Sequence, residues 1–182
     1  FSNVVWRHSV EMIRELHFPT PIYIFDHNDP SLNVQLERDI LNWMQQDKGL
    51  VRTNVQGWHS TTDMHEKPEY KRLVNALYEA QHKIFAEEHY ESEPFLGNMW
   101  AKAPNNSGHL KVDDPRASAS MIRPRQKTGK LPPRLYRETH YEPKAGRCIM
   151  FPAWLTHCVD PNESNENRIS VSFNFLQKGM FV

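Results

Sequence analysis

The chain has 182 residues, and its 22 lysines and arginines are balanced by 22 aspartates and glutamates. A net charge of zero excludes a protein whose whole surface binds nucleic acid or membrane through charge. The longest apolar run, Cys148 to Leu155, is too short to span a bilayer, and the first 30 residues contain no apolar signal core. We therefore expect a soluble cytoplasmic protein with one domain over residues 1–182 and with its two cysteines as free thiols.

The first half of the chain, residues 1–92, predicts one strand and two helices that pack on the core. Residues 21–25 are β-branched or aromatic and predict the strand. Asp29 is followed by proline and serine, which is typical of a helix cap and first turn. The first helix runs to Asp47, with apolar residues at helical spacing: Leu36, Ile40 and Trp43 or Met44. The second runs from Pro68 to His89, with apolar residues at the same spacing: Leu73, Leu77, Ile84 and Phe85. The residues before Met12 match no such pattern, so we expect Met12 to be the native start.

The second half, residues 93–182, has a β texture. Short apolar stretches are separated by proline, glycine and asparagine: PFLGNMW, HLKV, RCIMF, HCV and RISVSFNFL. This spacing is typical of a sandwich or jelly roll and not of a parallel βαβ sheet. The expected fold class is therefore mainly β (α+β), a jelly-roll core with N-terminal buttressing helices.

A basic stretch from Pro115 to Arg137 interrupts these strands. It carries seven arginines or lysines, no acidic residue and four prolines. This is too long and irregular for an ordinary connection, so it predicts a lid or arm. We expect it to close over a substrate; nucleic acid is not the expected partner, because a run of charge is usually a solvated loop.

The last strand has one polar and one apolar face. The turn-forming tip Asp160–Asn167 should fold this strand back beside that of His157. The polar face is expected to line a pocket. Its residues are Arg168, Ser170, Ser172 and Asn174, which alternate with Ile169, Val171, Phe173 and Phe175.

His157 and Arg168 are the candidate binding residues. An imidazole suits a metal ion, and a guanidinium is matched to a carboxylate, to which the Ser170 hydroxyl could add a hydrogen bond. A dicarboxylic acid would bridge the two. Each residue also has an alternative, purely structural role. His157 could be a histidine at a strand end whose hydrogen bonds are made within the protein, and Arg168 could form an ion pair with Glu163 or Glu166 in the tip.

These residues resemble a known family. The step from His157 to Arg168-Ile169-Ser170 is similar to the distal histidine and Arg-x-Ser of iron(II)- and 2-oxoglutarate-dependent oxygenases. From His17 onward the chain resembles an uncharacterised branch with many viral members, through GWHS, NMW, SGHLKVDDPR and FPAWLTHCVDPN. If the chain is viral, its location would be the host cytoplasm.

The resemblance implies a double-stranded β-helix that binds Fe(II) through two histidines and usually one carboxylate. It also implies 2-oxoglutarate as co-substrate, with ascorbate as a further candidate cofactor. The implied activity is a dioxygenase, a hydroxylase by default, whose unknown substrate is a protein side chain or a small molecule. On this basis His157 is the metal ligand, and Arg168 and Ser170 bind 2-oxoglutarate.

The proximal metal ligands that the family carries are not identifiable. Relatives place them after the NMW strand, and the join at Trp100–Ala101 is too short to contain them. We expect that a segment of some tens of residues is absent there. Three other histidine–carboxylate pairs in the sequence could replace the proximal ligands, but none is convincing. His27–Asp29 contains a helix cap, His89–Glu91 ends an amphipathic helix, and His140–Glu142 lies too close to His157.

Two other functions remain open from the sequence. One is a catalytically inactive jelly-roll binding module without a complete metal triad. The other, ranked last, is a zinc hydrolase, which would need three or four clustered ligands. Phe151 and Trp154 are expected in the core, and Trp58 and His59 either form a packed turn or line a pocket.

The expected missing segment makes a testable prediction. The intact protein isolated from its natural source should have a mass several kilodaltons above the 21.4 kDa of the 182 residues. Mass spectrometry measures this directly. A mass equal to that of the 182 residues would refute the missing segment.

Overall fold

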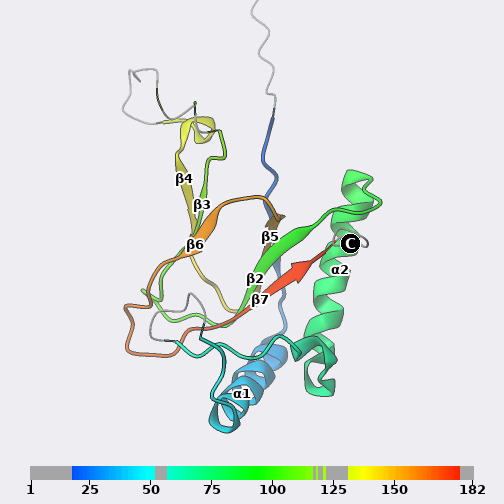
Figure 1. The fold of residues 1–182 in the computed structure, drawn as a ribbon, viewed down its shortest axis with the longest axis vertical. Coiled ribbons are helices and arrows are strands. Elements are labelled where there is room, and N and C mark those ends of the chain that lie inside the picture. The colour runs from blue at the N-terminus through cyan, green and yellow to red at the C-terminus, as the bar shows by residue number, and fades with distance from the viewer. Residues whose placement is uncertain (1–17, 52–56, 117, 119–120, 122–130, 177–182) are drawn as a thin grey trace, which may run out of the picture.

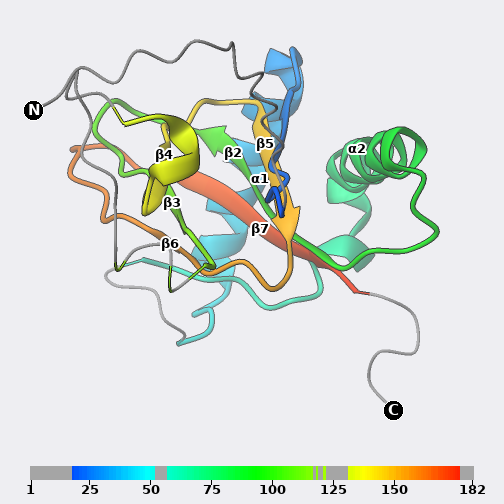
Figure 2. The ribbon, with the colours of Figure 1, turned by 90° about the horizontal axis from the view of Figure 1, so that it is seen from above.

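The fold is known from a computed structural model, which describes residues 18–51, 57–116, 118, 121 and 131–176. The candidate start at Met12 and most of the basic stretch from Pro115 to Arg137 lie outside these residues. The described part has three layers: two helices, a four-stranded sheet and a three-stranded sheet (Figure 1). Seen from above, α2 and the three-stranded sheet lie on opposite sides of the four-stranded sheet (Figure 2).

Both sheets are antiparallel. The four-stranded sheet has the order β1-β5-β2-β7, and the three-stranded sheet has the order β4-β3-β6. The first consists of β1 (Tyr23–Asp26), β2 (Phe95–Lys102), β5 (Arg147–Pro152) and β7 (Ile169–Phe175). The second consists of β3 (Leu110–Asp113), β4 (Glu138–Tyr141) and β6 (His157–Val159).

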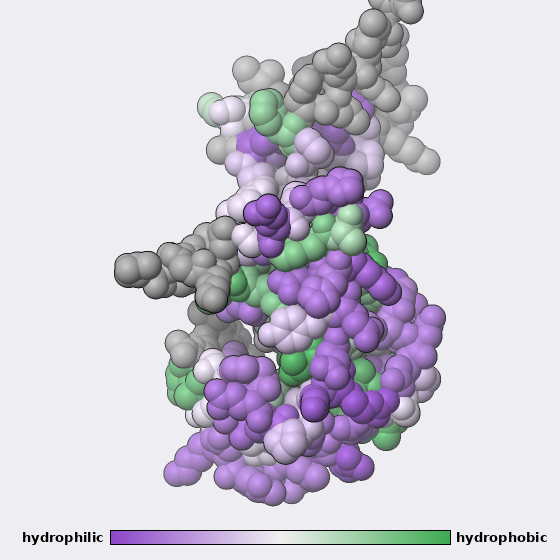
Figure 3. Space-filling model, turned by 90° about the vertical axis from the view of Figure 1, so that its right-hand side faces the viewer, coloured by the Kyte–Doolittle hydropathy of each residue, from purple (hydrophilic) through white to green (hydrophobic). Residues whose placement is uncertain are grey.

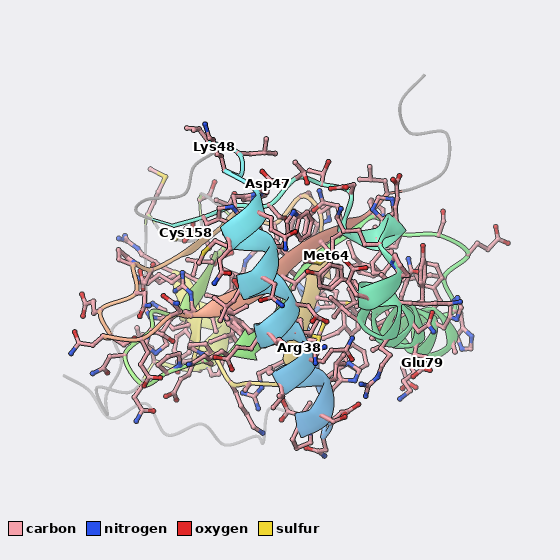
Figure 4. The ribbon with its side chains drawn as sticks, turned by 90° about the horizontal axis from the view of Figure 1, so that it is seen from below. Arg38, Asp47, Lys48, Met64, Glu79 and Cys158 are labelled. Carbon is pink, nitrogen blue, oxygen red and sulfur yellow. The ribbon has the colours of Figure 1, made fainter. Side chains whose placement is uncertain are left out.

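The two helices are α1 (Pro30–Gln46) and α2 (Lys71–Glu88). Asp29 caps α1, because its Oδ1 accepts a hydrogen bond from the backbone N–H of Leu32 at 3.1 Å. Figure 4 shows α1 crossing the molecule from below, with Arg38 along it and Asp47 just beyond its end. The side of the molecule that α2 covers is mainly hydrophilic (Figure 3), so the apolar faces of the helices are turned inward.

Alternation along the strands gives the four-stranded sheet two different faces. On the helix side, buried residues of α1 and α2 pack against Met99, Met150 and Val171. On the other side, a second cluster fills the space between the sheets: Trp100, Leu110, Val112, Ile149, Phe151 and Leu155. Because neighbours such as Met99 and Trp100 point to opposite faces, both clusters are built from the same strands.

The described fold agrees with the expected α+β class built on antiparallel sheets. The strand and both helices predicted in the first half are present, as are all five strands predicted in the second half. The short strand β4 was not predicted. None of the helices in the described part of the chain is long and apolar enough to cross a membrane.

Two expectations about packing are wrong. The strands of His157 and Arg168 are not neighbours, since β6 belongs to the three-stranded sheet and β7 to the four-stranded sheet. The tip between them crosses from one sheet to the other instead of closing a paired hairpin. Trp154 was expected in the core, but it lies in the turn between β5 and β6 and its exposed fraction is 57%, whereas Phe151 is buried as expected.

The packing of α1 on the sheet predicts a large difference between two substitutions in the same helix. Leu36 is buried in the core, so Leu36→Ala should lower the free energy of unfolding by about 2–5 kcal/mol. Val34 is exposed, so Val34→Ala should change it by less than about 0.5 kcal/mol. Urea denaturation measures both values. Equal effects would show that α1 does not pack as described.

Candidate functional site

His157 faces the space between the two sheets. It begins β6 and lies opposite Val112 of β3, whose side chain belongs to the inter-sheet cluster. The imidazole ring lies 4.8 Å from the ring of Phe151, which comes from β5 of the other sheet. Strand alternation therefore turns His157 inward, although its position on an edge strand leaves it exposed.

The ring of His157 is oriented by a backbone carbonyl. Its Nδ1 lies 2.9 Å from the carbonyl oxygen of Leu155. A hydrogen on Nδ1 satisfies that contact and leaves the lone pair of Nε2 for another partner. Histidines that bind metal are commonly held in this way, so His157 suits one ligand position.

An iron site of the implied kind needs three protein ligands. Within residues 18–51, 57–116, 118, 121 and 131–176, no group of three or more His, Cys, Asp or Glu residues could hold a metal ion. His157, the expected ligand, therefore has no companion ligands in this part of the chain. The described residues alone do not fit the metal.

The three substitute ligand pairs do not join His157. Asp29 of His27–Asp29 is engaged as a helix cap, and His89 follows α2 as an exposed residue, as expected from the sequence. His140 lies opposite Lys111, which on its other side pairs with Cys158. His140 and Cys158 therefore occupy the outer face of the three-stranded sheet. Figure 4 shows Cys158 on the opposite side of the molecule from Glu79 of α2.

Arg168 connects two loops of the three-stranded sheet to β7. Its Nη1 donates hydrogen bonds to the carbonyl oxygens of Ser107 and of Asp160, the latter at 2.9 Å. Ser107 precedes β3 and Asp160 follows β6. Gly108 allows this close approach: its φ is +84°, and a Cβ there would lie 2.9 Å from Nη1 and would overlap the Asp160 carbonyl oxygen.

No carboxylate of the described residues forms an ion pair with Arg168, although the negative charge of Asp160 acts on it and opposes the lowering of its pKa by burial. The structure records no ion pair for it within the described ranges, and Glu163 and Glu166 do not bind it. The Asp160 carboxylate instead lies 2.9 Å from Lys111 Nζ, and that hydrogen bond lowers the pKa of Asp160. Burial lowers the pKa of Arg168 below its ordinary value, but an arginine remains protonated at neutral pH. A half-buried cation of this kind attracts an anion.

The polar residues of β7 point into the space between the sheets. Ser170 pairs with Trp100 and Ser172 with Asn98, and both β2 residues lie on the side of the inter-sheet cluster. Ser172 Oγ also donates to Asn98 Oδ1 at 3.2 Å. The polar face of β7 is exposed at this edge of the sheet.

Strand β2 is irregular at the join where a segment was expected to be missing. Trp100 pairs with Ser170, but Lys102 pairs with Ile169, so Ala101 is an extra residue in the ladder. Such a bulge locally breaks the pairing of a strand. The four-stranded sheet thus changes register beside the Trp100–Ala101 peptide.

Of the two cavities described below, neither is lined by His157 or by Arg168. One, of about 460 Å³, lies near Val112, Arg116, Tyr136 and Leu155. The other, of about 380 Å³, lies between β1 and α2. Trp58 forms a packed turn, since its Nε1 donates to the Asp47 carbonyl oxygen at 2.8 Å.

Asn98 was not predicted as a site residue. It stands in a mainly apolar strand and is buried, with Ser172 as the partner of its side-chain oxygen. A lone amide at an inward position of a buried strand is the signal that could have identified it.

The two carbonyl contacts of Arg168 predict a structural role beside any role in binding. Arg168→Ala leaves the carbonyls of Ser107 and Asp160 without this donor, so the free energy of unfolding should fall by about 1–3 kcal/mol. Ser170 is exposed, and Ser170→Ala should change it by less than about 0.5 kcal/mol. Urea denaturation compares them, and an unchanged stability of Arg168→Ala would contradict the bridging contacts.

Comparison with known proteins adds one match. A family model described as "Putative 2OG-Fe(II) oxygenase", where 2OG is 2-oxoglutarate, matches residues 74–174. The match runs from α2 into β7 and includes His157, Arg168, Ser170 and Asn98. No curated protein matches the chain. Because the match covers more than half of the sequence, the chain belongs to this 2OG-Fe(II) oxygenase family.

Proposed function

We propose that the protein is a non-haem Fe(II)- and 2-oxoglutarate-dependent dioxygenase that hydroxylates a second substrate, either a protein side chain or a small molecule. Membership of the family supports the class of reaction. The observation that carries the proposal is the half-buried guanidinium of Arg168, which forms no ion pair with a carboxylate of the described residues. It stands on the same side of β7 as Ser170, facing the space toward which His157 is turned.

The described residues would divide the work of binding. Arg168 supplies positive charge to one carboxylate of 2-oxoglutarate, together with its Nε and Nη2 donors, which have no partner among the described residues. Ser170 adds a hydroxyl two residues further along. His157 offers Nε2 to the metal, while Leu155 and Phe151 hold the ring in place. When bound, Fe(II) supplies the oxidative chemistry, and the protein contributes position and shielding.

The remaining metal ligands belong to the proposed missing segment between Trp100 and Ala101. The bulge at Ala101 supports this proposal, because it disturbs the ladder beside the join. The position of β6 at the edge of its sheet is a second support. A strand added beside β6 would bring new side chains next to His157.

The second candidate function is a binding module that recognises a dicarboxylate without turning it over. The specific observation in its favour is that Arg168 already serves two backbone carbonyls and so has a structural reason to be present. A fold does not determine activity, so both functions are compatible with the same architecture.

Anaerobic titration with Fe(II) and 2-oxoglutarate separates the two functions. The dioxygenase should give a visible charge-transfer band and should release succinate when oxygen is admitted. His157→Ala should abolish both signals, because it removes the imidazole that is proposed to bind the metal. The matched control is His140→Ala, on the outer face of the same sheet, which should keep both.

Two results would contradict the dioxygenase. One is the absence of both band and succinate in the wild-type protein while 2-oxoglutarate still binds, which is the behaviour of a binding module. The other is equal signals from wild type and His157→Ala. In an active protein, succinate release across a panel of peptides and metabolites would identify the second substrate.

A further inference from the structure

The larger of the two cavities lies beside the space toward which His157 is turned. Its volume is about 460 Å³, which is within the range of about 300–1,000 Å³ that is usual for ligand pockets. Val112 and Leu155 line it, and both are neighbours of His157. Val112 is the cross-strand partner of His157, and the carbonyl oxygen of Leu155 lies 2.9 Å from its Nδ1. The cavity therefore adjoins the proposed metal ligand.

One row of the three-stranded sheet leads from His157 into this cavity. The row consists of His157 in β6, Val112 in β3 and Thr139 in β4, which pair across the strands and share a face. Val112 and Thr139 both line the cavity. Because neighbouring strands lie about 4.8 Å apart, a group held above Val112 would lie one strand spacing from the imidazole.

Hydrogen bonds of Arg116 fix one wall of the cavity. Its Nε and Nη2 donate to the two carboxylate oxygens of Asp114 at 2.8 and 2.9 Å, and Nη2 also donates to the carbonyl oxygen of Arg134 at 3.0 Å. These contacts connect the chain that follows β3 to the chain that precedes β4. The wall is therefore held by the protein itself, and the exposed ring of Tyr136 lines the cavity beside it.

Strand β4 borders the cavity and forms an edge of its sheet (Figure 1). The carbonyl oxygen of Arg137 accepts a hydrogen bond from the N–H of Asp114 at 2.7 Å, so every second residue from Arg137 onward directs its backbone groups to β3. The N–H and C=O of Glu138 and His140 are then directed to the open edge. The structure records no hydrogen bond between them and other described residues. Such an edge can pair with an extended segment of another chain.

The charges beside this edge favour an acidic segment. Asp113 and Glu138 pair with each other on the outer face of the sheet, because their neighbour Val112 faces inward. The other charged residues that line the cavity are three arginines and one aspartate: Arg116, Arg134, Arg137 and Asp114. This surplus of positive charge attracts acidic residues.

We propose that the second substrate is an extended, acidic segment of another protein, which pairs with the edge of β4 and places one side chain in the cavity above Val112. This deepens the proposed function and rests on it, because that side chain is presented to the metal bound by His157. A small metabolite would fit the cavity, but it has no peptide backbone with which to pair with β4.

The probe is a pool of synthetic peptides in which a variable central residue is flanked by glutamates. A matched pool has lysines at the flanking positions, and a third pool contains free amino acids and other metabolites. With Fe(II) and 2-oxoglutarate present, the glutamate pool should raise succinate release, and mass spectrometry should find peptides that have gained one oxygen atom. The lysine pool should raise succinate release at least about tenfold less, because its charges are repelled.

Two substitutions of one residue test the edge of β4. His140→Pro removes an N–H that is directed to the open edge and places a ring there, so the response to the glutamate pool should fall at least about tenfold. Edge strands tolerate a proline whose N–H would lie outside the ladder. The matched control is His140→Ala, which keeps the N–H and should respond within about twofold of wild type. Circular dichroism checks that both variants are folded.

A second measurement uses the wild-type chain without metal. Hydrogen exchange at the backbone amides of Glu138 and His140 should slow when the glutamate pool is added, because these N–H groups gain acceptors from the peptide. The metabolite pool should leave their exchange unchanged. Peptide turnover without slower exchange at these amides would contradict the pairing with β4.

The remaining outcomes distinguish this inference from the proposed function. Absence of the charge-transfer band and of succinate under every condition would overturn both. Succinate release that only the metabolite pool raises, or a peptide response that His140→Pro keeps within about twofold, would overturn the inference alone. A dimer that His140→Pro dissociates would also overturn it, because the edge would then bind a second copy of the chain. Analytical ultracentrifugation measures this.

Discussion

The hydrogen bonds of Arg168 hold together the parts on which the candidate site depends. One guanidinium nitrogen, on the residue that precedes β7, serves a carbonyl before β3 and another after β6. These contacts fix the edge of the four-stranded sheet against the three-stranded sheet. The positive φ of Gly108 permits the approach, so the backbone there is shaped around the arginine. Without the Arg168 side chain, these hydrogen bonds between β7 and the loops beside β3 and β6 would be lost, and the position of His157 relative to β7 would be less firmly held.

The inter-sheet core supplies the second constraint. Trp100, Ile149 and Phe151 of the four-stranded sheet meet Leu110 and Val112 of the other sheet. The same alternation that buries Val112 turns its cross-strand partner His157 inward. The imidazole of His157, the proposed metal ligand, and the guanidinium of Arg168, the proposed carboxylate ligand, thereby lie beside the same inter-sheet space and come from two different sheets. The charge of Arg168, which forms no ion pair in the described residues, is the reason that an anionic ligand is proposed for this face.

Local patterns predicted much of the fold because they depend on neighbouring residues. The alternation in β7 and the cap at Asp29 are read from spacing alone, and the structure has both. The sheet that each strand joins depends on long-range packing. The turn formers between Val159 and Arg168 therefore suggested a paired hairpin, whereas this connection crosses between the sheets. Trp154 was assigned to the core because aromatic residues usually pack inward, but the turn after β5 leaves it exposed.

The candidate site was only partly predictable for the same reason. His157, Arg168 and Ser170 have a recognisable spacing in the sequence. That Asn98 and Trp100 lie beside Ser172 and Ser170 can be seen only from the cross-strand register. The most direct test of a diacid site between the sheets is a crystal structure of the chain grown with Mn(II) and 2-oxoglutarate. The expected result is electron density for the ligand between His157 and Arg168, with one carboxylate beside Arg168. Density for the ligand elsewhere, or side chains filling that space, would contradict the site.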